Sequence, residues 1–170
     1  MSFIYVVNDD NSARYILGEK GDSPILCIGI NPSIATSEKP DMTIKSVRNR
    51  VQDNYNGWIM LNIYPQITTK PDSLHKEIDI DIHNENLKYI EQLATQYSKF
   101  DIWATWGSSI TRRKYLFDCL KDIVSVFNKL EVRWFKADTP SFHPHHPLYL
   151  SKQTSLVEFD IKAYLKIKNN

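Results

Sequence analysis

Apolar residues along this chain form short continuous runs that alternate with stretches of helical spacing. Four runs bounded by turn-forming residues predict strands buried on both faces of a parallel sheet: residues 24–30, 58–63, 101–105 and 131–135. Between the runs, apolar side chains recur every three or four residues, which predicts amphipathic helices. These helices are expected after Asp41, which can cap the first one, at residues 84–97 and at residues 109–128.

The two ends of the chain add smaller elements. Residues 3–7 and 14–17 are β-prone runs on either side of a polar turn, and they predict a hairpin. A short strand at 156–159 and a helix from Asp160 are expected to close the chain. Because strands and helices alternate, the prediction is an α/β three-layer sandwich with a four-stranded parallel core sheet and an N-terminal β-hairpin. Residues 1–170 form one domain in this interpretation, without internal repeats or linkers.

Composition places the chain among ordinary globular proteins. Of its 170 residues, 42% are hydrophobic and 24% are charged. No apolar run approaches the roughly 20 residues of a membrane span, and the first residues lack the pattern of a signal peptide. We therefore expect a cytoplasmic protein without contact with a membrane. Cys27 and Cys119 are expected to be two buried thiols, although a disulfide is possible, and two cysteines cannot hold a four-thiolate iron–sulfur cluster.

The charge pattern gives no global attraction to nucleic acid, because the formal net charge is only +1. Any basic surface must therefore be local. One cluster contains Lys45, Arg48 and Arg50, and another spans residues 112–114. They are either solvated helix faces or contacts for phosphate groups, and the second interpretation gains weight because both clusters follow predicted strand ends.

Four short motifs fall at the carboxyl ends of the predicted parallel strands. In open α/β sheets, ligands bind in the crevice outside these strand ends. The motifs are therefore expected to converge on one pocket: residues 29–33 (Gly-Ile-Asn-Pro-Ser), 61–65 (Leu-Asn-Ile-Tyr-Pro), 103–108 (Trp-Ala-Thr-Trp-Gly-Ser) and 143–149 (His-Pro-His-His-Pro-Leu-Tyr).

The first two motifs place an asparagine at a strand end. Gly29 permits close approach of a ligand, and Pro32 restricts the conformation of Asn31 before it. The Asn31 amide can then position a water or contact a polar ligand, although the same residues also suit a purely structural turn. Asn62 fits a strand poorly, so it either pairs with the polar edge of a ligand such as a nucleobase or hydrogen-bonds a neighbouring loop.

The last two motifs offer helix amides and imidazoles. Ser108 or Ser109 can cap the following helix, whose free amides would suit an anion if the basic cluster beyond, with Arg112, contributes. Three histidines within residues 143–146 resemble a metal site, but Pro144 keeps the segment extended and no acidic or Cys ligand is nearby. We expect no metal and no cofactor, and interpret the segment as a fixed loop that presents a His donor or simply packs.

Taken in order, these motifs resemble the uracil-DNA glycosylase superfamily, which has Gly-x-Asn-Pro or Gly-x-Asp-Pro, Leu-Asn, Trp-Gly and His-Pro-Ser-Pro-Leu segments. The residues 29–33 resemble its mismatch-specific branch, where an Asn replaces the catalytic Asp. The chain as a whole resembles more closely an uncharacterised bacterial and phage family, domain of unknown function 1643. The residues that carry this second resemblance are Arg14-Tyr15-Ile16-Leu17, Asn31-Pro32-Ser33, Asp41, Thr43-Ile44, Asn62, Asn84, Trp106-Gly107 and His146-Pro147-Leu148-Tyr149.

The glycosylase resemblance implies roles for individual residues. Asn31 would position the attacking water, Asn62 would read the base edge, and His143 or His146 would stabilise the negative charge on the departing base. The chain departs from that pattern because its first motif has no carboxylate and its last loop lacks the Ser that contacts phosphate. The candidate binding residues are Gly29, Pro32, Ser33, Asn62, Tyr64, Trp106, Gly107, Ser108 and Arg112, with Tyr64 or Trp106 as an aromatic that stacks on a base.

Two functions of different classes follow. One is a nucleobase-recognising hydrolase of N-glycosidic bonds, acting on nucleic acid or a nucleoside. The other is a non-catalytic protein that binds a nucleotide or nucleic acid on the same fold.

Overall fold

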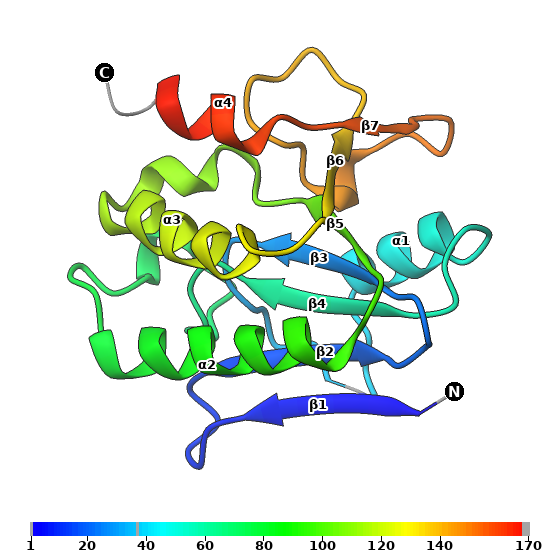
Figure 1. Ribbon diagram of the computed structural model, residues 1–170. Helices are drawn as coiled ribbons and strands as arrows, with labels where there is room; N and C mark the ends of the chain where they lie inside the picture. The colour runs from blue at the N-terminus through cyan, green and yellow to red at the C-terminus, as the bar shows by residue number, and fades with distance from the viewer. Residues whose placement is uncertain (1, 37, 168–170) are drawn as a thin grey trace.

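The structure is a computed structural model that describes residues 2–36 and 38–167. Its centre is one seven-stranded sheet in the order β1-β2-β4-β3-β5-β6-β7 (Figure 1). The strands are β1 (Phe3–Val7), β2 (Arg14–Glu19), β3 (Ile25–Gly29), β4 (Trp58–Asn62), β5 (Asp101–Ala104), β6 (Arg133–Ala137) and β7 (Leu156–Glu158). The four neighbours β4, β3, β5 and β6 run parallel, whereas β1, β2 and β7 pair antiparallel at the two edges.

The prediction of a mixed α/β architecture is confirmed, but the sheet is wider than expected. The N-terminal hairpin does not stand apart from the main sheet, because Leu17 of β2 pairs with Met60 of β4. At the other edge, β7 pairs with β6 and extends the sheet by one more strand. The hairpin residues therefore belong to the same sheet as the strand-end motifs.

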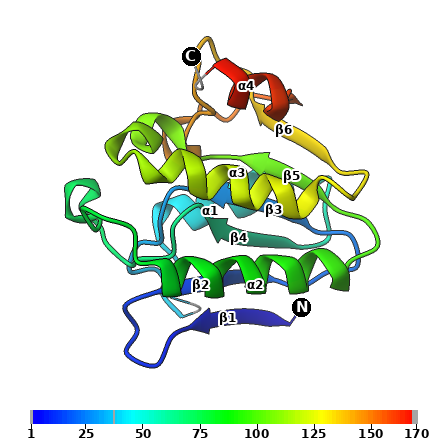
Figure 2. The same ribbon diagram turned by 60° about the vertical axis from the view of Figure 1, so that its left-hand side comes forward.

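Helices cover both faces of the sheet. Helix α1 (Met42–Val51) lies on one face, while α2 (Ile80–Gln96) and α3 (Tyr115–Phe127) lie side by side on the other, as Figure 2 shows. The core is divided accordingly. Ile44 and Val47 of α1 pack in one apolar cluster with Trp103, and Ile90 of α2 and Leu120 of α3 belong to the larger cluster on the opposite face. The last helix, α4 (Ile161–Ile167), joins the larger cluster through its own buried residues.

Two predicted helices differ from the structure. The helix expected at 84–97 begins at Ile80, because the side chain of Asp79 accepts hydrogen bonds from the first free amides. The helix expected at 109–128 is interrupted. A 3-10 helix, Gly107–Arg112, comes first, α3 begins only at Tyr115, and neither element has a side-chain cap from Ser108 or Ser109.

The two cysteines are buried free thiols, so the alternative of a disulfide is wrong. Burial raises the pKa of both thiols, that of Cys119 to about 12, which leaves them protonated and unreactive. Among residues 2–36 and 38–167, no helix combines the length and the apolar character needed to span a bilayer.

Gly18 fixes the approach of the hairpin to β4. A Cβ atom at this position would lie 2.3 Å from the backbone oxygen of Trp58. Gly18→Ala should therefore lower the free energy of unfolding by about 1–3 kcal/mol, as overpacking does where the neighbour is backbone. Urea unfolding monitored by circular dichroism measures the change.

The matched control is Gly29→Ala, whose added methyl group would meet the side-chain oxygen of Asn62 at 3.3 Å and no backbone atom closer than 3.9 Å. It should cost less stability than Gly18→Ala. If both variants lose the same unfolding free energy, the close approach of Gly18 to the backbone of Trp58 is not the reason that a glycine is needed in β2.

Candidate functional site

A small cavity of about 70 Å³ lies at the carboxyl ends of β3, β4 and β5. Strands β3 and β5 are neighbours in the sheet. The chain goes from β3 to β4, which lies on the side away from β5, and from β5 to β6, which lies on the side away from β3. The cavity therefore occupies the topological switch point of the sheet. Its walls combine residues from all four strand-end motifs with the hairpin and the start of α1. They are formed by Arg14, Gly29, Ile30, Asn31, Ser33, Asp41, Thr43, Ile44, Met60, Asn62, Thr105, His146 and Pro147.

Asn31 is fixed by the chain that follows β4. Its Nδ2 donates to the carbonyl oxygens of Thr68 at 2.9 Å and Pro32 at 3.0 Å. In return, the Thr68 amide donates to the Pro32 carbonyl, so the two loops hold each other. Because the nitrogen of the amide faces the loop, the Oδ1 atom on its opposite side is the atom that Asn31 offers to a ligand.

Asn62 is almost completely buried, with 2% of its surface exposed, and it ends β4 on the cavity wall. Its backbone carbonyl accepts a hydrogen bond from Nδ2 of Asn86, a fully buried residue of α2. Its own Nδ2 is buried and has no hydrogen-bond partner among the described residues. Gly29 lies beside it, where the missing Cβ leaves room for the Asn62 amide. The amide is therefore a rigid donor that the protein itself does not satisfy.

Arg14, in β2, supplies a second donor of this kind. The residue is 3% exposed, and its Nη1 donates to the carbonyl oxygens of Ser33 and Ala35. Its Nε is buried without a partner, and among the described residues no carboxylate lies within ion-pair distance of the guanidinium. Burial lowers the pKa of Arg14 to about 10, and the negative charge of Asp41 partly opposes this shift. The group still carries a full positive charge at neutral pH.

Asp41 is the only carboxylate among the residues that line the cavity. It is the N-cap of α1, as the sequence predicts, because its Oδ1 accepts from the Ile44 amide at 2.9 Å. Its Oδ2 accepts a hydrogen bond from the hydroxyl of Ser33. Each carboxylate oxygen has two acceptor positions, so both oxygens retain capacity for a further donor.

The histidine loop contributes one imidazole to the cavity wall, that of His146. Its Nδ1 accepts from the Leu148 amide at 3.3 Å, which places the proton of the neutral ring on Nε2. Burial lowers the pKa of His146, so the ring is neutral at pH 7. His143 instead bonds the hydroxyl of Tyr164 at 2.8 Å and does not line the cavity. Of the two histidines that the resemblance offers, His146 lines the cavity and His143 does not.

The structure does not bring several other candidates to the cavity. Tyr64 is fully buried, and its hydroxyl bonds His75. Trp106 is 1% exposed and donates to Tyr164, so neither ring offers a free face for stacking. Both residues combine an apolar ring with a polar atom that finds its partner inside the core, which explains why they pack rather than bind. Pro32, Gly107, Ser108 and Arg112 also lie outside the lining, and Arg112 forms an ion pair with Asp72 at 2.6 Å.

The basic cluster at residues 112–114 serves a structural purpose in part. Arg113 donates to the backbone carbonyls of Asp72, Leu74 and His75 and so holds that loop against the 3-10 helix. In the other cluster, Arg48 pairs with Glu19 at 3.0 Å. Among the residues that the structure describes, no group of three His, Cys, Asp or Glu side chains is arranged to hold a metal ion.

From the sequence, Arg14 enters only the family resemblance and Thr105 only a strand-end motif, and Asp41 is expected to cap a helix. The signal for Arg14 is a charged residue inside an otherwise apolar run, Ala13 to Leu17. Such a residue is expected at an edge or with a partner, but only the pairing of β2 with β4 places it at the cavity. Thr105 is fully buried, and its hydroxyl donates to the Ile28 carbonyl at 2.8 Å, which braces the ends of β3 and β5.

The lowered pKa of His146 predicts a pH dependence of stability. Its folded-state pKa lies below the ordinary value of 6.5, so the unfolded chain binds the proton more tightly. The stability contributed by the neutral ring is present above pH 6.5 and is lost as the pH falls below it, with a slope of at most about 1.4 kcal/mol per pH unit. His146→Asn should flatten the pH dependence of the unfolding free energy below pH 6.5, measured by urea titrations at a series of pH values.

His145→Asn is the control for the loss of an imidazole from the same loop, since His145 does not line the cavity and bonds the carbonyl of His146. A His146→Asn variant whose acid-side slope matches that of the wild type would show that the ring is not held neutral by its surroundings.

Comparison with known proteins gives one match. The model of a family described as protein of unknown function (DUF1643) matches residues 14–148. This span includes every residue on the cavity wall, from Arg14 to Pro147. Neither the curated proteins nor the solved structures that were compared contain a match. The matched span covers most of the chain, which therefore belongs to the DUF1643 family.

Proposed function

We propose that the cavity binds the polar edge of a nucleobase and that the protein hydrolyses an N-glycosidic bond. The observation that carries the proposal is a pair of buried donors on the wall of one cavity, Arg14 Nε and Asn62 Nδ2, which have no hydrogen-bond partner in the part of the chain that the structure describes. Each such donor costs about 1–3 kcal/mol when nothing satisfies it. A ligand with two hydrogen-bond acceptors would recover both costs, and the carbonyl oxygens and ring nitrogens of a base are acceptors of this kind.

The volume of the cavity limits what it encloses. About 70 Å³ is well below the roughly 300–1,000 Å³ of pockets that bury whole drug-sized ligands. It suits the edge of a planar ring, with the sugar left outside at the strand ends. Enclosing a complete base would require the segments around Asn31 or His146 to move apart.

The arrangement supplies the groups that glycosidic hydrolysis needs. The bond between the sugar C1′ and the base nitrogen breaks, and the base leaves with the electron pair. The Nε2–H of neutral His146, with Asn62 and Arg14, would donate to the oxygen or nitrogen on which this charge develops. A water molecule would add to C1′. Asn31 Oδ1 would accept a hydrogen bond from this water, and Asp41 would take up its proton.

The resemblance to the uracil-DNA glycosylase superfamily supports this proposal, including a uracil-DNA glycosylase-like fold. Asn31, Asn62 and His146 stand at the positions of its motifs and share one cavity in this chain. The substrate would be a nucleic acid or a nucleoside. Incubation with oligonucleotides that carry uracil, mismatched or damaged bases, scored for abasic sites, tests the catalytic part.

The second candidate function is binding of a nucleotide or nucleic acid without chemistry. It is favoured by the contacts of Asn31 and Asp41, the two groups that the hydrolytic mechanism assigns to the water. The Asn31 amide nitrogen is taken by loop carbonyls, and both oxygens of Asp41 already accept a hydrogen bond. Binding of a base-containing ligand without abasic sites would favour this candidate.

Asn62→Ala distinguishes a binding role from a structural one. Loss of a buried hydrogen bond to a base should weaken its affinity by about 1–3 kcal/mol, or roughly 5- to 150-fold. Stability should change little, because Asn62 Nδ2 satisfies nothing in the protein. Free bases and nucleosides are first screened by calorimetry on the wild type, and the variant is then titrated with the ligand that binds and unfolded with urea.

Asn84→Ala, an exposed change on α2, is the matched control and should alter neither quantity. If Asn62→Ala unfolds the protein, or binds the ligand as tightly as the wild type does, Asn62 is a structural residue and the cavity is not the base site.

A further inference from the structure

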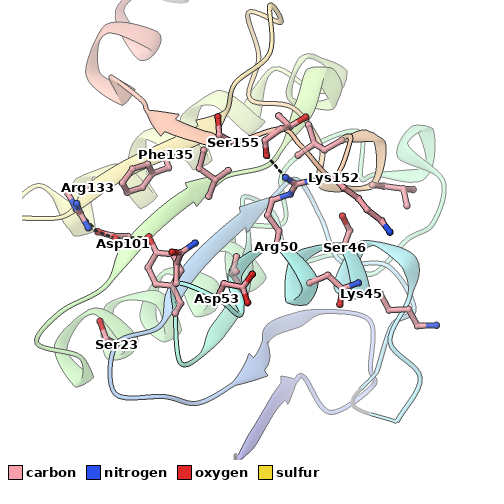
Figure 3. A pocket seen from close by; sticks show the side chains of 18 of the residues that line it. Ser23, Lys45, Ser46, Arg50, Asp53, Asp101, Arg133, Phe135, Lys152 and Ser155 are labelled. Carbon is pink, nitrogen blue, oxygen red and sulfur yellow. Dashed lines mark hydrogen bonds and ion pairs between the residues drawn. The ribbon is translucent and has the colours of Figure 1, made fainter.

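A second, much larger hollow of about 1,110 Å³ runs along the α1 face of the sheet. One wall is α1, and the other is formed by β6 with the segment from Leu148 to Leu156 (Figure 3). We name it the α1 groove. It begins beside the cavity, because Thr43 and Pro147 line the cavity while their neighbours Met42 and Leu148 line the groove. It ends at Asp101 and Arg133, the first residues of β5 and β6.

The groove concentrates positive charge that the chain as a whole lacks. Five of the 21 Lys and Arg residues line it, against two of the 20 Asp and Glu residues: Lys45, Arg50, Lys99, Arg133 and Lys152 against Asp53 and Asp101. Asp101 and Arg133 form an ion pair with two hydrogen bonds, and Tyr55 donates a third hydrogen bond to Asp101, so these two charges cancel and four cations remain against Asp53. A groove of this charge attracts a polyanion while the net charge of the protein stays near zero.

Arg50 sits at the middle of the groove and is built into it. Its guanidinium reaches across from α1 towards the opposite wall (Figure 3), where it donates to the carbonyls of Ser151 and Thr154. Its Nε is buried and has no partner among the described residues. Its charge is therefore fixed in place, and the hydrogen-bond partners of the guanidinium among the described residues are neutral carbonyls.

Between the cations, the groove presents flat and apolar side chains. Phe135 points into it from β6, and the guanidinium of Arg133 lies 5.3 Å from the centre of the Phe135 ring. Because side chains alternate along a strand, Arg133 and Phe135 share the α1 face of β6. Tyr55, Met42 and Leu148 add further apolar surface.

We infer that the α1 groove binds a single nucleic-acid strand, with its phosphates along the lysines and arginines and at least one base on Phe135. Cationic grooves with interleaved aromatic rings are the general solution for single strands, since every base has a face that stacks. The inference rests on the proposed function in one respect, namely that a strand in the groove would lead to the cavity that takes a base. A duplex does not suit a groove bounded on both sides.

The test measures fluorescence anisotropy of a labelled oligo-deoxythymidine of about 12 nucleotides, within the usual range of site sizes. Lys45→Glu combined with Lys152→Glu changes two exposed residues on opposite walls. Affinity at low salt should fall on the order of tenfold per lysine, and the slope of log K against log salt should decrease by about 1.4, which is about 0.7 per lost phosphate contact. Phe135→Ala should weaken binding by about 5- to 150-fold with a nearly unchanged salt slope.

Lys76→Glu combined with Lys129→Glu makes the same change of net charge away from the groove and should leave binding near that of the wild type. Absence of binding to the single strand, or equal loss in the control pair, overturns the inference. So does tighter binding to a duplex of the same length, or binding of poly-glutamate that the groove variants weaken equally, since the latter would identify an acidic peptide as the occupant.

The two proposals fail in different ways. Asn62→Ala reports on the cavity and should not change the affinity for oligo-deoxythymidine if the groove alone holds the strand. If the groove variants bind oligo-deoxythymidine more weakly while Asn62→Ala leaves base binding unchanged, the groove is supported as the binding site for the strand and the proposed function of the cavity is wrong.

Discussion

Arg14 carries a positive charge into the interior between β2 and the loop that follows β3. Two backbone carbonyls, of Ser33 and Ala35, accept from its Nη1, and the nearby charge of Asp41 favours its protonated form. These contacts offset only part of what burial of a charge costs, because the Nε finds no partner among residues 2–36 and 38–167. The rest of the site depends on this interaction, since the carbonyls that hold Arg14 belong to the loop that places Ser33 against Asp41.

The remaining walls are held by hydrogen bonds between segments far apart in sequence. The Ser46 hydroxyl of α1 donates to the Pro147 carbonyl, and the Gly107 amide donates to the Pro144 carbonyl. Gly107 has a φ of 64°, a left-handed conformation that glycine adopts without strain, which turns the chain after β5 towards the histidine loop. The loop that carries His146 is thus fixed from two sides. A site built in this way is organised before a ligand arrives, which reduces the entropy lost on binding.

Those parts of the structure that local patterning governs could be predicted from the sequence. Buried strands read as continuous apolar runs, so the ends of β3 and β4, and with them Asn31 and Asn62, were placed correctly. Arg14 could not be placed, because its position depends on the non-local pairing of β2 with β4. Either Tyr64 or Trp106 was expected to stack on a base. The polar atom of Trp106 instead bonds Tyr164, which is far away in the sequence, and that of Tyr64 bonds His75 in an irregular loop. Only three-dimensional packing decides between the two outcomes for such side chains.

Helix α1 belongs to both hollows of the molecule. Asp41 and the first turn contribute Thr43 and Ile44 to the cavity, while Met42 and Lys45 face the groove. Successive residues of a helix point about 100° apart, so one turn can serve two sides without any extra element. The helix is also tied to both neighbouring segments, through Ser46 to Pro147 and through Arg50 to Ser151 and Thr154. A displacement of α1 that opened the small cavity to a whole base would therefore move a wall of the groove as well, and the two hollows change shape together.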